Sequence, residues 1–84
     1  MEWNDRIKEL VAVGASITAN CQPCLQYHAD KARKEGATSQ EIEAAIGVGK
    51  QVRKGASAKM DEFSSSVKEA VSAPAGEKKS VCCG

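Results

Sequence analysis

Two cysteines and a histidine form the clearest chemical pattern in this sequence. Cys21 and Cys24 enclose Gln22 and Pro23, and His28 follows four residues after the second cysteine. On a helix, residues at these spacings share one face, so we expect the three side chains to line up near a helix start. Free N–H groups and the dipole at a helix N-terminus stabilise a thiolate, and a nearby imidazole can accept the thiol proton. Two thiols this close can also form a disulfide, so the pattern predicts dithiol redox chemistry.

Other interpretations of these residues stay open at this point. A structural zinc site needs four ligands, and Cys21, Cys24 and His28 supply three, with the fourth coming from Glu9 or from thiols near the chain end. The cysteines can also be buried small apolar residues without chemistry. Attachment of a c-type haem is excluded, because that motif needs a histidine directly after its second cysteine.

A second cysteine pair, Cys82 and Cys83, lies near the end of the sequence. The residues before it have no periodicity and no apolar anchor, which predicts a flexible tail over residues 73–84. Adjacent cysteines form a strained disulfide that is easily reduced, and such a bond suits transfer rather than structure. We therefore interpret Cys82 and Cys83 as accessory thiols that reach the first pair. The alternative is a tail whose thiols have no role.

The stretch from Glu9 to about Gly49 resembles the alkyl hydroperoxidase D and carboxymuconolactone decarboxylase family, as a short member with a single motif. The resemblance rests on Glu9, twelve residues before Cys21, and on the spacing of Cys21, Cys24 and His28. The flanking residues 14–20 and 36–42 also resemble the family. The resemblance implies an all-helical fold, assembly as trimers or hexamers, and a peroxidase-like activity in which two thiols are oxidised to a disulfide.

The resemblance also implies a role for each site residue. Cys24 would be the attacking thiolate, Cys21 the resolving thiol, and His28 with Glu9 a proton relay. A thiolate that attacks a peroxide becomes a sulfenic acid, and a second thiol converts this into a disulfide. At Pro23 the chain departs from well-studied peroxidase members, which carry a second histidine there. The motif is thereby closer to those of general disulfide exchange.

The predicted function is that of a thiol–disulfide oxidoreductase with alkyl hydroperoxide reductase-like activity. Its substrate would be a hydroperoxide or a disulfide, and its electrons would come from a dithiol or a thioredoxin-like donor, with no cofactor. One alternative is a protein that binds a soft metal or metalloid through Cys21, Cys24, Cys82 and Cys83. A second alternative is a non-catalytic helical assembly module.

Three helices must position these residues. The first is predicted from Asn4 to about Thr18, because apolar residues recur there at spacings of three and four and Asn4 can cap the start. The second runs from Cys21 or Gln22 to about Glu35. Pro23 is tolerated in its first turn, and Gly36 supplies a stop after it.

A third, longer helix is predicted from the capping box that Thr38 begins and Glu41 completes. Helical spacing of apolar residues then continues to about Ser72. Glycines 47, 49 and 55 lie inside this helix, and we interpret them as points where another helix approaches closely, with a bend of the helix as the alternative. The four basic residues between them and beyond are expected to form a solvated face: Lys50, Arg53, Lys54 and Lys59.

Length and composition limit the architecture. The 84 residues fit one domain, and Trp3, Tyr27 and Phe63 are the only aromatic residues. A core made of small side chains gives little burial energy, so partner subunits are expected. The sequence predicts an all-α subunit with two antiparallel helices and a long third helix, assembling as an oligomer. Its helical domain would span residues 1–72 and its tail residues 73–84.

Charge and hydropathy exclude several partners. The net charge is +1, with 12 basic and 11 acidic residues interspersed, which argues against binding nucleic acid or an anionic membrane. No apolar run has the length of a bilayer span, and the first residues lack the pattern of a signal peptide. We therefore expect the protein to lie in the cytoplasm, where thiols are kept reduced.

Overall fold

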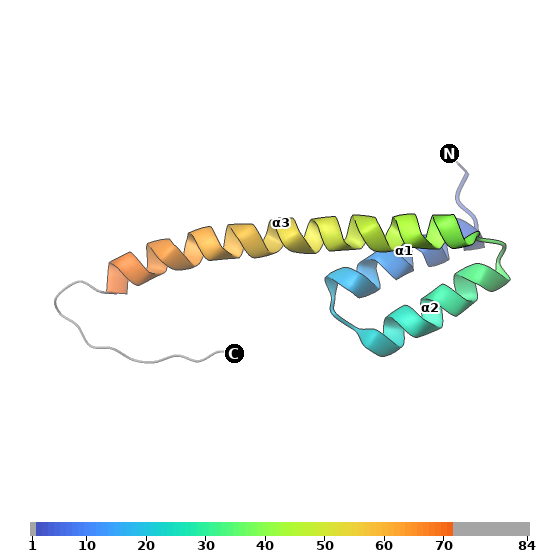
Figure 1. The fold of residues 1–84 in the computed structure, drawn as a ribbon, viewed down its shortest axis with the longest axis horizontal. Helices are drawn as coiled ribbons and strands as arrows, with labels where there is room; N and C mark the ends of the chain where they lie inside the picture. Colours follow the sequence, from blue (N-terminus) through green and yellow to red (C-terminus); the bar gives the residue numbers. More distant parts are fainter. Residues whose placement is uncertain (1, 72–84) are drawn as a thin grey trace.

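The computed structural model describes residues 2–71, which form three helices (Figure 1). They are α1 (Asp5–Thr18), α2 (Gln22–Lys34) and α3 (Ser39–Val71), with no strand in this part of the chain. α1 and α2 run in opposite directions, and α1 packs against both α2 and α3, which barely touch each other. The all-helical prediction is therefore confirmed. The oligomer stays a prediction, and the predicted tail of residues 73–84 lies outside the described residues.

The helix boundaries follow the predicted caps. The Asn4 side chain accepts a hydrogen bond of 2.9 Å from the N–H of Ile7 at the start of α1. At the start of α3, the N–H of Thr38 donates to the Glu41 carboxylate and the N–H of Glu41 donates to the Thr38 hydroxyl, both over 3.0 Å. Gly36 has a φ of +98°, which the residue after a helix end commonly needs. Local hydrogen bonding thus fixes where these helices begin and end.

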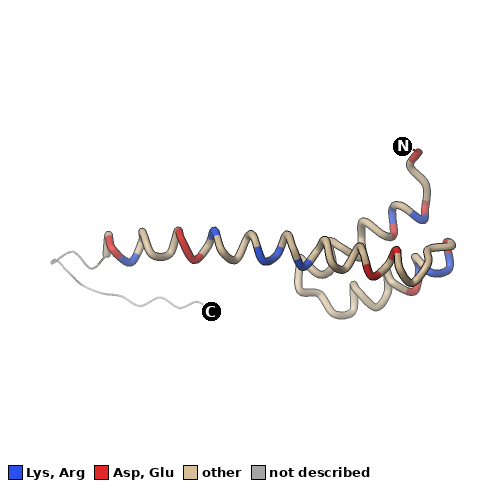
Figure 2. The backbone as a smooth tube through the Cα atoms, turned by 45° about the horizontal axis from the view of Figure 1, so that its top comes forward, with Lys and Arg blue, Asp and Glu red and all other residues tan. Residues whose placement is uncertain are grey.

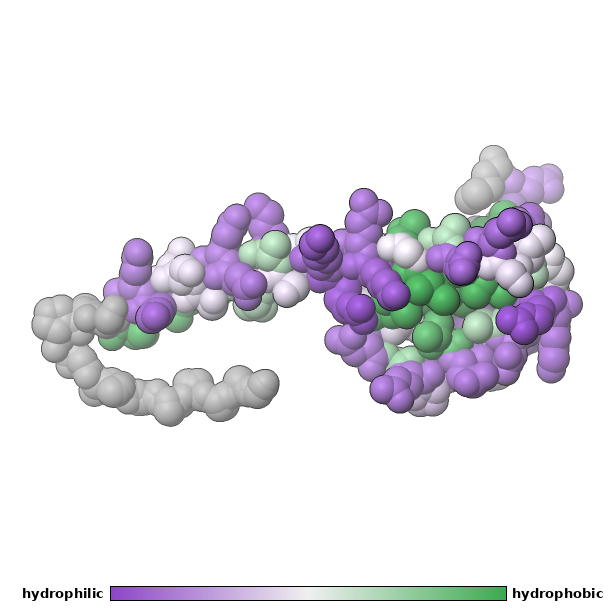
Figure 3. Space-filling view, viewed as in Figure 1, coloured by the Kyte–Doolittle hydropathy of each residue, from purple (hydrophilic) through white to green (hydrophobic). Residues whose placement is uncertain are grey.

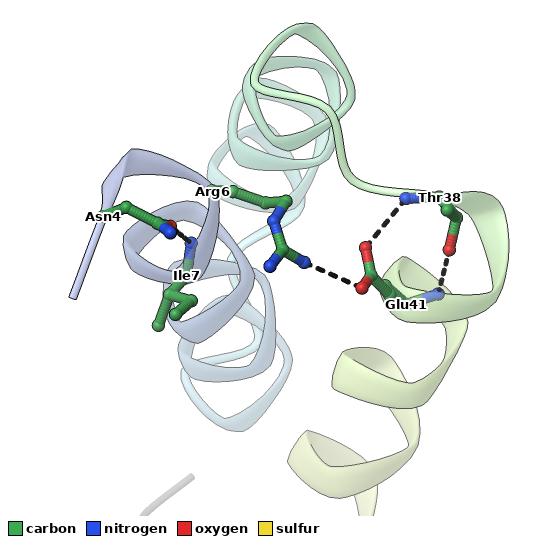
Figure 4. Close-up of polar contacts among 5 residues, drawn as sticks. All are labelled: Asn4, Arg6, Ile7, Thr38 and Glu41. Atoms are coloured by element: carbon green, nitrogen blue, oxygen red, sulfur yellow. Dashed lines mark hydrogen bonds and ion pairs between the residues drawn. The ribbon is translucent and has the colours of Figure 1, made fainter. Parts of the chain in front are cut away.

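A single ion pair joins the starts of α1 and α3. Arg6 Nη1 lies 2.7 Å from Glu41 Oε2, so the carboxylate of the capping box also binds α1 (Figure 4). The hydrogen bond from the Thr38 N–H, followed by the one from Arg6, lowers the pKa of the Glu41 carboxyl below its usual value. Glu41 therefore stays ionised and serves both the helix cap and the packing of the two helices.

The hydrophobic core is small and lies at one end of the molecule. Val13, Ala32, Ala37 and Ile42 are buried, and partly buried apolar residues surround them. α3 projects beyond this bundle of described residues, and each of its residues from 54 to 71 is exposed (Figure 1). Figure 3 shows the main apolar surface over the bundle, with smaller apolar areas along the projecting part of α3. Among the described residues, no helix combines the length and apolarity that crossing a bilayer requires.

The helices α1 and α3 come closest at Gly14 and Gly49. A Cβ atom on Gly49 would lie 2.5 Å from the Gly14 carbonyl oxygen and 2.8 Å from the Ile17 Cβ. The Thr18 hydroxyl lies 3.3 Å from both the Gly14 and the Gly49 carbonyl oxygens. The predicted close approach is thus confirmed for Gly49. It is wrong, within residues 2–71, for Gly47 and Gly55, where a Cβ would meet no atom within 4 Å.

This contact predicts opposite effects for two glycine substitutions on one helix. Gly49→Ala should lower the free energy of unfolding by about 1–3 kcal/mol, because the backbone of α1 must move away. Gly55→Ala should raise it by about 0.5–1 kcal/mol, because alanine favours the helix and meets no neighbour. Urea unfolding followed by circular dichroism at one fixed protein concentration measures both. Equal effects of the two substitutions would contradict the close contact.

Candidate functional site

The two cysteines of the motif form a disulfide at the start of α2. Cys21 is the N-cap residue, with an extended backbone, and Cys24 lies in the first turn, with 5.3 Å between their Cα atoms. The Cys24 N–H donates to the Cys21 sulfur over 3.2 Å. Asn20, at φ 56°, makes the turn that leads into the helix, and asparagine tolerates this left-handed conformation. The backbone thus places the Cys21 sulfur where a helix N-terminus stabilises negative charge.

Glu9 and His28 form a pair across the interface of α1 and α2. His28 Nδ1 lies 2.6 Å from Glu9 Oε1, and the Glu9 side chain is only 5% exposed. Lys8 Nζ lies 4.0 Å from the other carboxylate oxygen. In the sequence only its spacing to Cys21 distinguishes Glu9 from an ordinary surface carboxylate, whereas the structure shows a buried carboxylate bound to the imidazole. The structure therefore brings these two predicted site residues together.

The charge of Glu9 is fixed by its surroundings. The hydrogen bond from His28 lowers the pKa of the Glu9 carboxyl, burial opposes this, and the positive charges of His28, Lys31 and Lys8 lower it further. The net effect is a pKa below the usual 4.5, so Glu9 is ionised at neutral pH. A carboxylate only accepts hydrogen bonds, so Nδ1 of His28 must carry the proton. In the neutral imidazole, Nε2 is then free to accept a proton.

The two cysteines differ in exposure. Cys24 is exposed, whereas Cys21 is half-buried. His28 follows Cys24 by one helical turn on α2, so the two residues share a face of that helix. The exposed ring of Tyr27 packs edge-on against the imidazole, with 4.9 Å between the ring centroids. The site can therefore exchange protons at His28 and meet a solvent-borne molecule at Cys24.

Sequence analysis missed Arg53, which was expected on a solvated face of α3. Arg53 is half-buried, and its Nη1 donates to the Asn20 side-chain oxygen over 2.9 Å and to the Ile17 carbonyl over 3.3 Å. With Cys21 it lines a cavity of about 180 Å³. No pattern in the sequence connects position 53 with position 21, so only the packing of α3 on α1 reveals the contact.

The metal-site interpretation gains no support from the described residues. Between residues 2 and 71, no group of three or more histidine, cysteine, aspartate and glutamate side chains is arranged to hold an ion. Cys82 and Cys83, the predicted accessory thiols and further soft-metal ligands, lie outside the described residues. Their roles stay predictions.

Comparison with known proteins gives one family match. The sequence profile of the carboxymuconolactone decarboxylase family matches residues 2–60. A protein from Paracoccus denitrificans, described as uncharacterized protein 4 in cox locus, is 41% identical over 51 residues. These residues make up 61% of this chain and 46% of the relative, so the similarity spans about half the length of that protein. No solved structure matches the chain.

The Glu9–His28 pair predicts a loss of stability in acid. A carboxyl whose pKa is lowered by folding stabilises the protein fully above its unfolded-state pKa, near 4.5, and this contribution disappears as pH falls through the folded-state pKa. Glu9→Gln should therefore be less stable than the natural protein at about pH 7, and the difference should shrink towards about pH 3. Urea unfolding at a series of pH values measures this.

The control is Glu43→Gln, which changes an exposed carboxylate on α3. This variant should follow the pH dependence of the natural protein. A constant difference between Glu9→Gln and the natural protein across the whole pH range would show that the ionised Glu9 contributes nothing to stability.

Proposed function

Because the chain belongs to the carboxymuconolactone decarboxylase family, we propose that it is a thiol–disulfide oxidoreductase with alkyl hydroperoxide reductase-like activity. The observation that carries this proposal is the combination on α2. Its N-terminus holds the Cys21–Cys24 disulfide, and one turn after Cys24 it holds His28, bound to the buried Glu9. A dithiol beside an oriented imidazole can reduce a peroxide while it is itself oxidised reversibly to a disulfide.

The reaction starts from the reduced pair. His28 takes the proton of Cys24 at Nε2, and the resulting thiolate attacks the hydroperoxide, so that a sulfur–oxygen bond forms and the O–O bond breaks. Cys24 becomes a sulfenic acid, and the alkoxide that leaves takes the proton back from His28 and departs as an alcohol. Cys21 then attacks the sulfenic sulfur and releases water. The products are one alcohol, one water and the disulfide.

Glu9 acts through His28 in this scheme. Its carboxylate keeps the Nδ1 proton in place and leaves Nε2 to move protons between sulfur and substrate. When Nε2 is protonated, the negative charge of Glu9 stabilises the imidazolium. Because Glu9 is buried on α1 and His28 lies on α2, the packing of the two helices also sets the direction of the imidazole.

The cycle closes when a dithiol or a thioredoxin-like donor reduces the disulfide by two electrons. A cycle of this kind operates in a compartment that supplies reducing equivalents, which is the reason for proposing a cytoplasmic location. Disulfide exchange with another substrate would use the same two sulfurs, so the peroxide is the part of the proposal that needs a direct test.

Two cysteine variants test the assigned roles. Cys24→Ser should consume no hydroperoxide, because the attacking sulfur is missing. Cys21→Ser, made in a chain whose Cys82 and Cys83 are also changed to serine, should consume one equivalent and stop, with a sulfenic acid on Cys24 that a dimedone-type reagent traps, because no thiol remains to resolve it. Peroxide loss and mass spectrometry measure the two outcomes. Full turnover by Cys24→Ser would remove that residue from the attacking role.

We further propose that the protein forms a homo-oligomer, a trimer or hexamer, through the projecting part of α3. An isolated helix of this length is marginal in water, and Met60, Phe63, Val67 and Val71 are exposed along one stripe of it. Within the bundle, α1 and α3 form an almost wholly apolar groove of about 470 Å³, lined in part by Val11, Val48 and Val52. The stripe of one chain is chemically suited to cover the groove of another.

A pair of lysine substitutions tests this interface. The full chain should show a mass of three or six times 8.9 kDa in light scattering. Phe63→Lys should shift it towards the monomer, because it places a charge in the apolar contact. Ser65→Lys, which adds the same charge on another face of α3, should leave the oligomer intact. A monomeric natural protein, or equal behaviour of the two variants, would contradict the interface.

A further inference from the structure

We propose that the cavity beside Cys21 and the basic surface of α3 next to it form a recognition site for the electron donor, and that this donor is a small thiol carrying a carboxylate. The inference rests on the proposed dithiol cycle and names a small monothiol as the reductant, in place of a dithiol or thioredoxin-like donor. Nothing in the resemblance or in the family match assigns a role to this surface. It is argued from the cavity, the placement of Arg53 and the distribution of charge on α3.

The cavity is the right size for a small molecule and gives access to only one of the two sulfur-bearing residues. Its volume is about 180 Å³, and Cys21 lines it while Cys24 does not. A cavity of about 150 Å³ accommodates a molecule such as benzene, so this one can admit a short thiol. Apart from Arg53, its remaining wall is partly polar and partly apolar, and is formed by Ser16, Ile17, Asn20, Gln22 and Leu25. The Ser16 hydroxyl is occupied, since it donates to the Ala12 carbonyl over 2.7 Å.

Arg53 supplies a fixed positive charge at this cavity. Both of its hydrogen bonds, to Ile17 and Asn20, leave from Nη1 and hold the guanidinium in place at the C-terminal end of α1. Among residues 2–71, Nε and Nη2 have no protein acceptor and can bind a ligand. A guanidinium matches the geometry of a carboxylate, and partial burial reduces the screening of its charge by solvent. The structure thus presents an anion-binding group beside a redox-active cysteine.

The charge continues outward from the cavity. An open hollow of about 870 Å³ shares Asn20 and Arg53 with it and is also lined by Lys50 and Lys54, with Asp61 as its one acidic residue. Figure 2 shows these basic positions on α3 where that helix leaves the bundle. The sequence from residue 44 to residue 60 contains four basic residues and no acidic one. A surface of one sign raises the local concentration of ligands of the opposite sign.

Reduction at this site takes two steps. The thiolate of the donor attacks the Cys21 sulfur, a new disulfide forms between donor and Cys21, and the Cys21–Cys24 bond breaks with its electron pair on Cys24. A second donor thiolate attacks the donor sulfur of this mixed disulfide, which releases Cys21 as a thiolate and the oxidised donor as a disulfide. Two thiols are oxidised, one protein disulfide is reduced, and the two protons released by the donors end on the protein dithiol and solvent.

The test compares donors that differ in charge. The oxidised full-length protein is mixed with 3-mercaptopropionate, its neutral amide or cysteamine, and the appearance of protein thiols is followed. Each rate is divided by the rate of the same thiol with a small neutral disulfide, which removes differences in thiol reactivity. The normalised rate should be about three- to tenfold higher for the carboxylate than for the amide, lowest for cysteamine, and the preference should weaken with added salt.

Matched variants locate the effect. The double variant Lys50→Gln with Lys54→Gln changes two exposed side chains and should reduce the preference for the carboxylate. Arg53→Gln should abolish this preference. Lys59→Gln is the control and should leave the preference for the carboxylate unchanged. Lys59 lines neither the cavity nor the hollow, and its Nζ lies 3.7 Å from the Glu62 carboxylate. Because Arg53 also hydrogen-bonds to the end of α1, the double lysine variant decides the test if Arg53→Gln folds poorly. Mass spectrometry of the trapped intermediate should find the donor on Cys21.

The outcomes separate this inference from the function on which it rests. Equal normalised rates for the three thiols, or a preference unchanged in the lysine pair, would overturn the recognition site while the peroxide reaction stands. A donor found on Cys24 would overturn the role of the cavity. Chemically reduced protein that hydroperoxide never converts back to the disulfide would instead refute the proposed function, whatever the order of the thiols.

Discussion

A buried carboxylate bound to an imidazole is the interaction on which this small structure depends. An ionised group in the interior is unfavourable unless it is paired, and Glu9 finds its partner only if α1 and α2 pack in one register. With few large side chains in the core, this contact and the Arg6–Glu41 pair set much of the relative position of the three helices. The same hydrogen bond fixes the tautomer of His28, so folding and proton chemistry use one pair of atoms.

The two sulfurs of the Cys21–Cys24 disulfide have different surroundings. Cys21 caps the helix, is half-buried and lines a cavity with Arg53, whereas Cys24 is exposed one turn before His28. In the proposed cycle, peroxide meets the reduced Cys24 thiolate, whereas the reductant attacks the Cys21 sulfur of the disulfide. Pro23 fits the first turn of α2 because the amide hydrogen that proline lacks has no partner there. The second histidine of peroxidase relatives is thus replaced by a residue that suits the helix start, and His28 is the one imidazole in the chain.

The second half of α3 projects beyond the bundle that the described residues form, and this sets the context of the site. The apolar stripe on its projecting part and the apolar groove between α1 and α3 face solvent in a single chain. An arrangement of this kind is stable when copies of the chain cover each other, which the small core also favours. The basic segment from Lys50 to Lys59 lies between the bundle and the stripe. It is therefore close to both the Cys21–Cys24 disulfide and the proposed interface.

Local patterns in the sequence predict the three helices, their ends and the paired cysteines. These features depend on contacts between residues a few positions apart, such as Asn4 with Ile7, Thr38 with Glu41 and Cys21 with Cys24. The spacing of Glu9 to the cysteines resembles that of a known family, which made Glu9 a candidate. Only the packing of α1 on α2 shows that Glu9 is buried and bound to His28. Tertiary structure alone decided the contact of Gly14 with Gly49, the lack of such contacts at Gly47 and Gly55, and the place of Arg53 beside Cys21. The physical reason is that a local pattern fixes which face of a helix is apolar, whereas the register between distant helices decides which atoms meet.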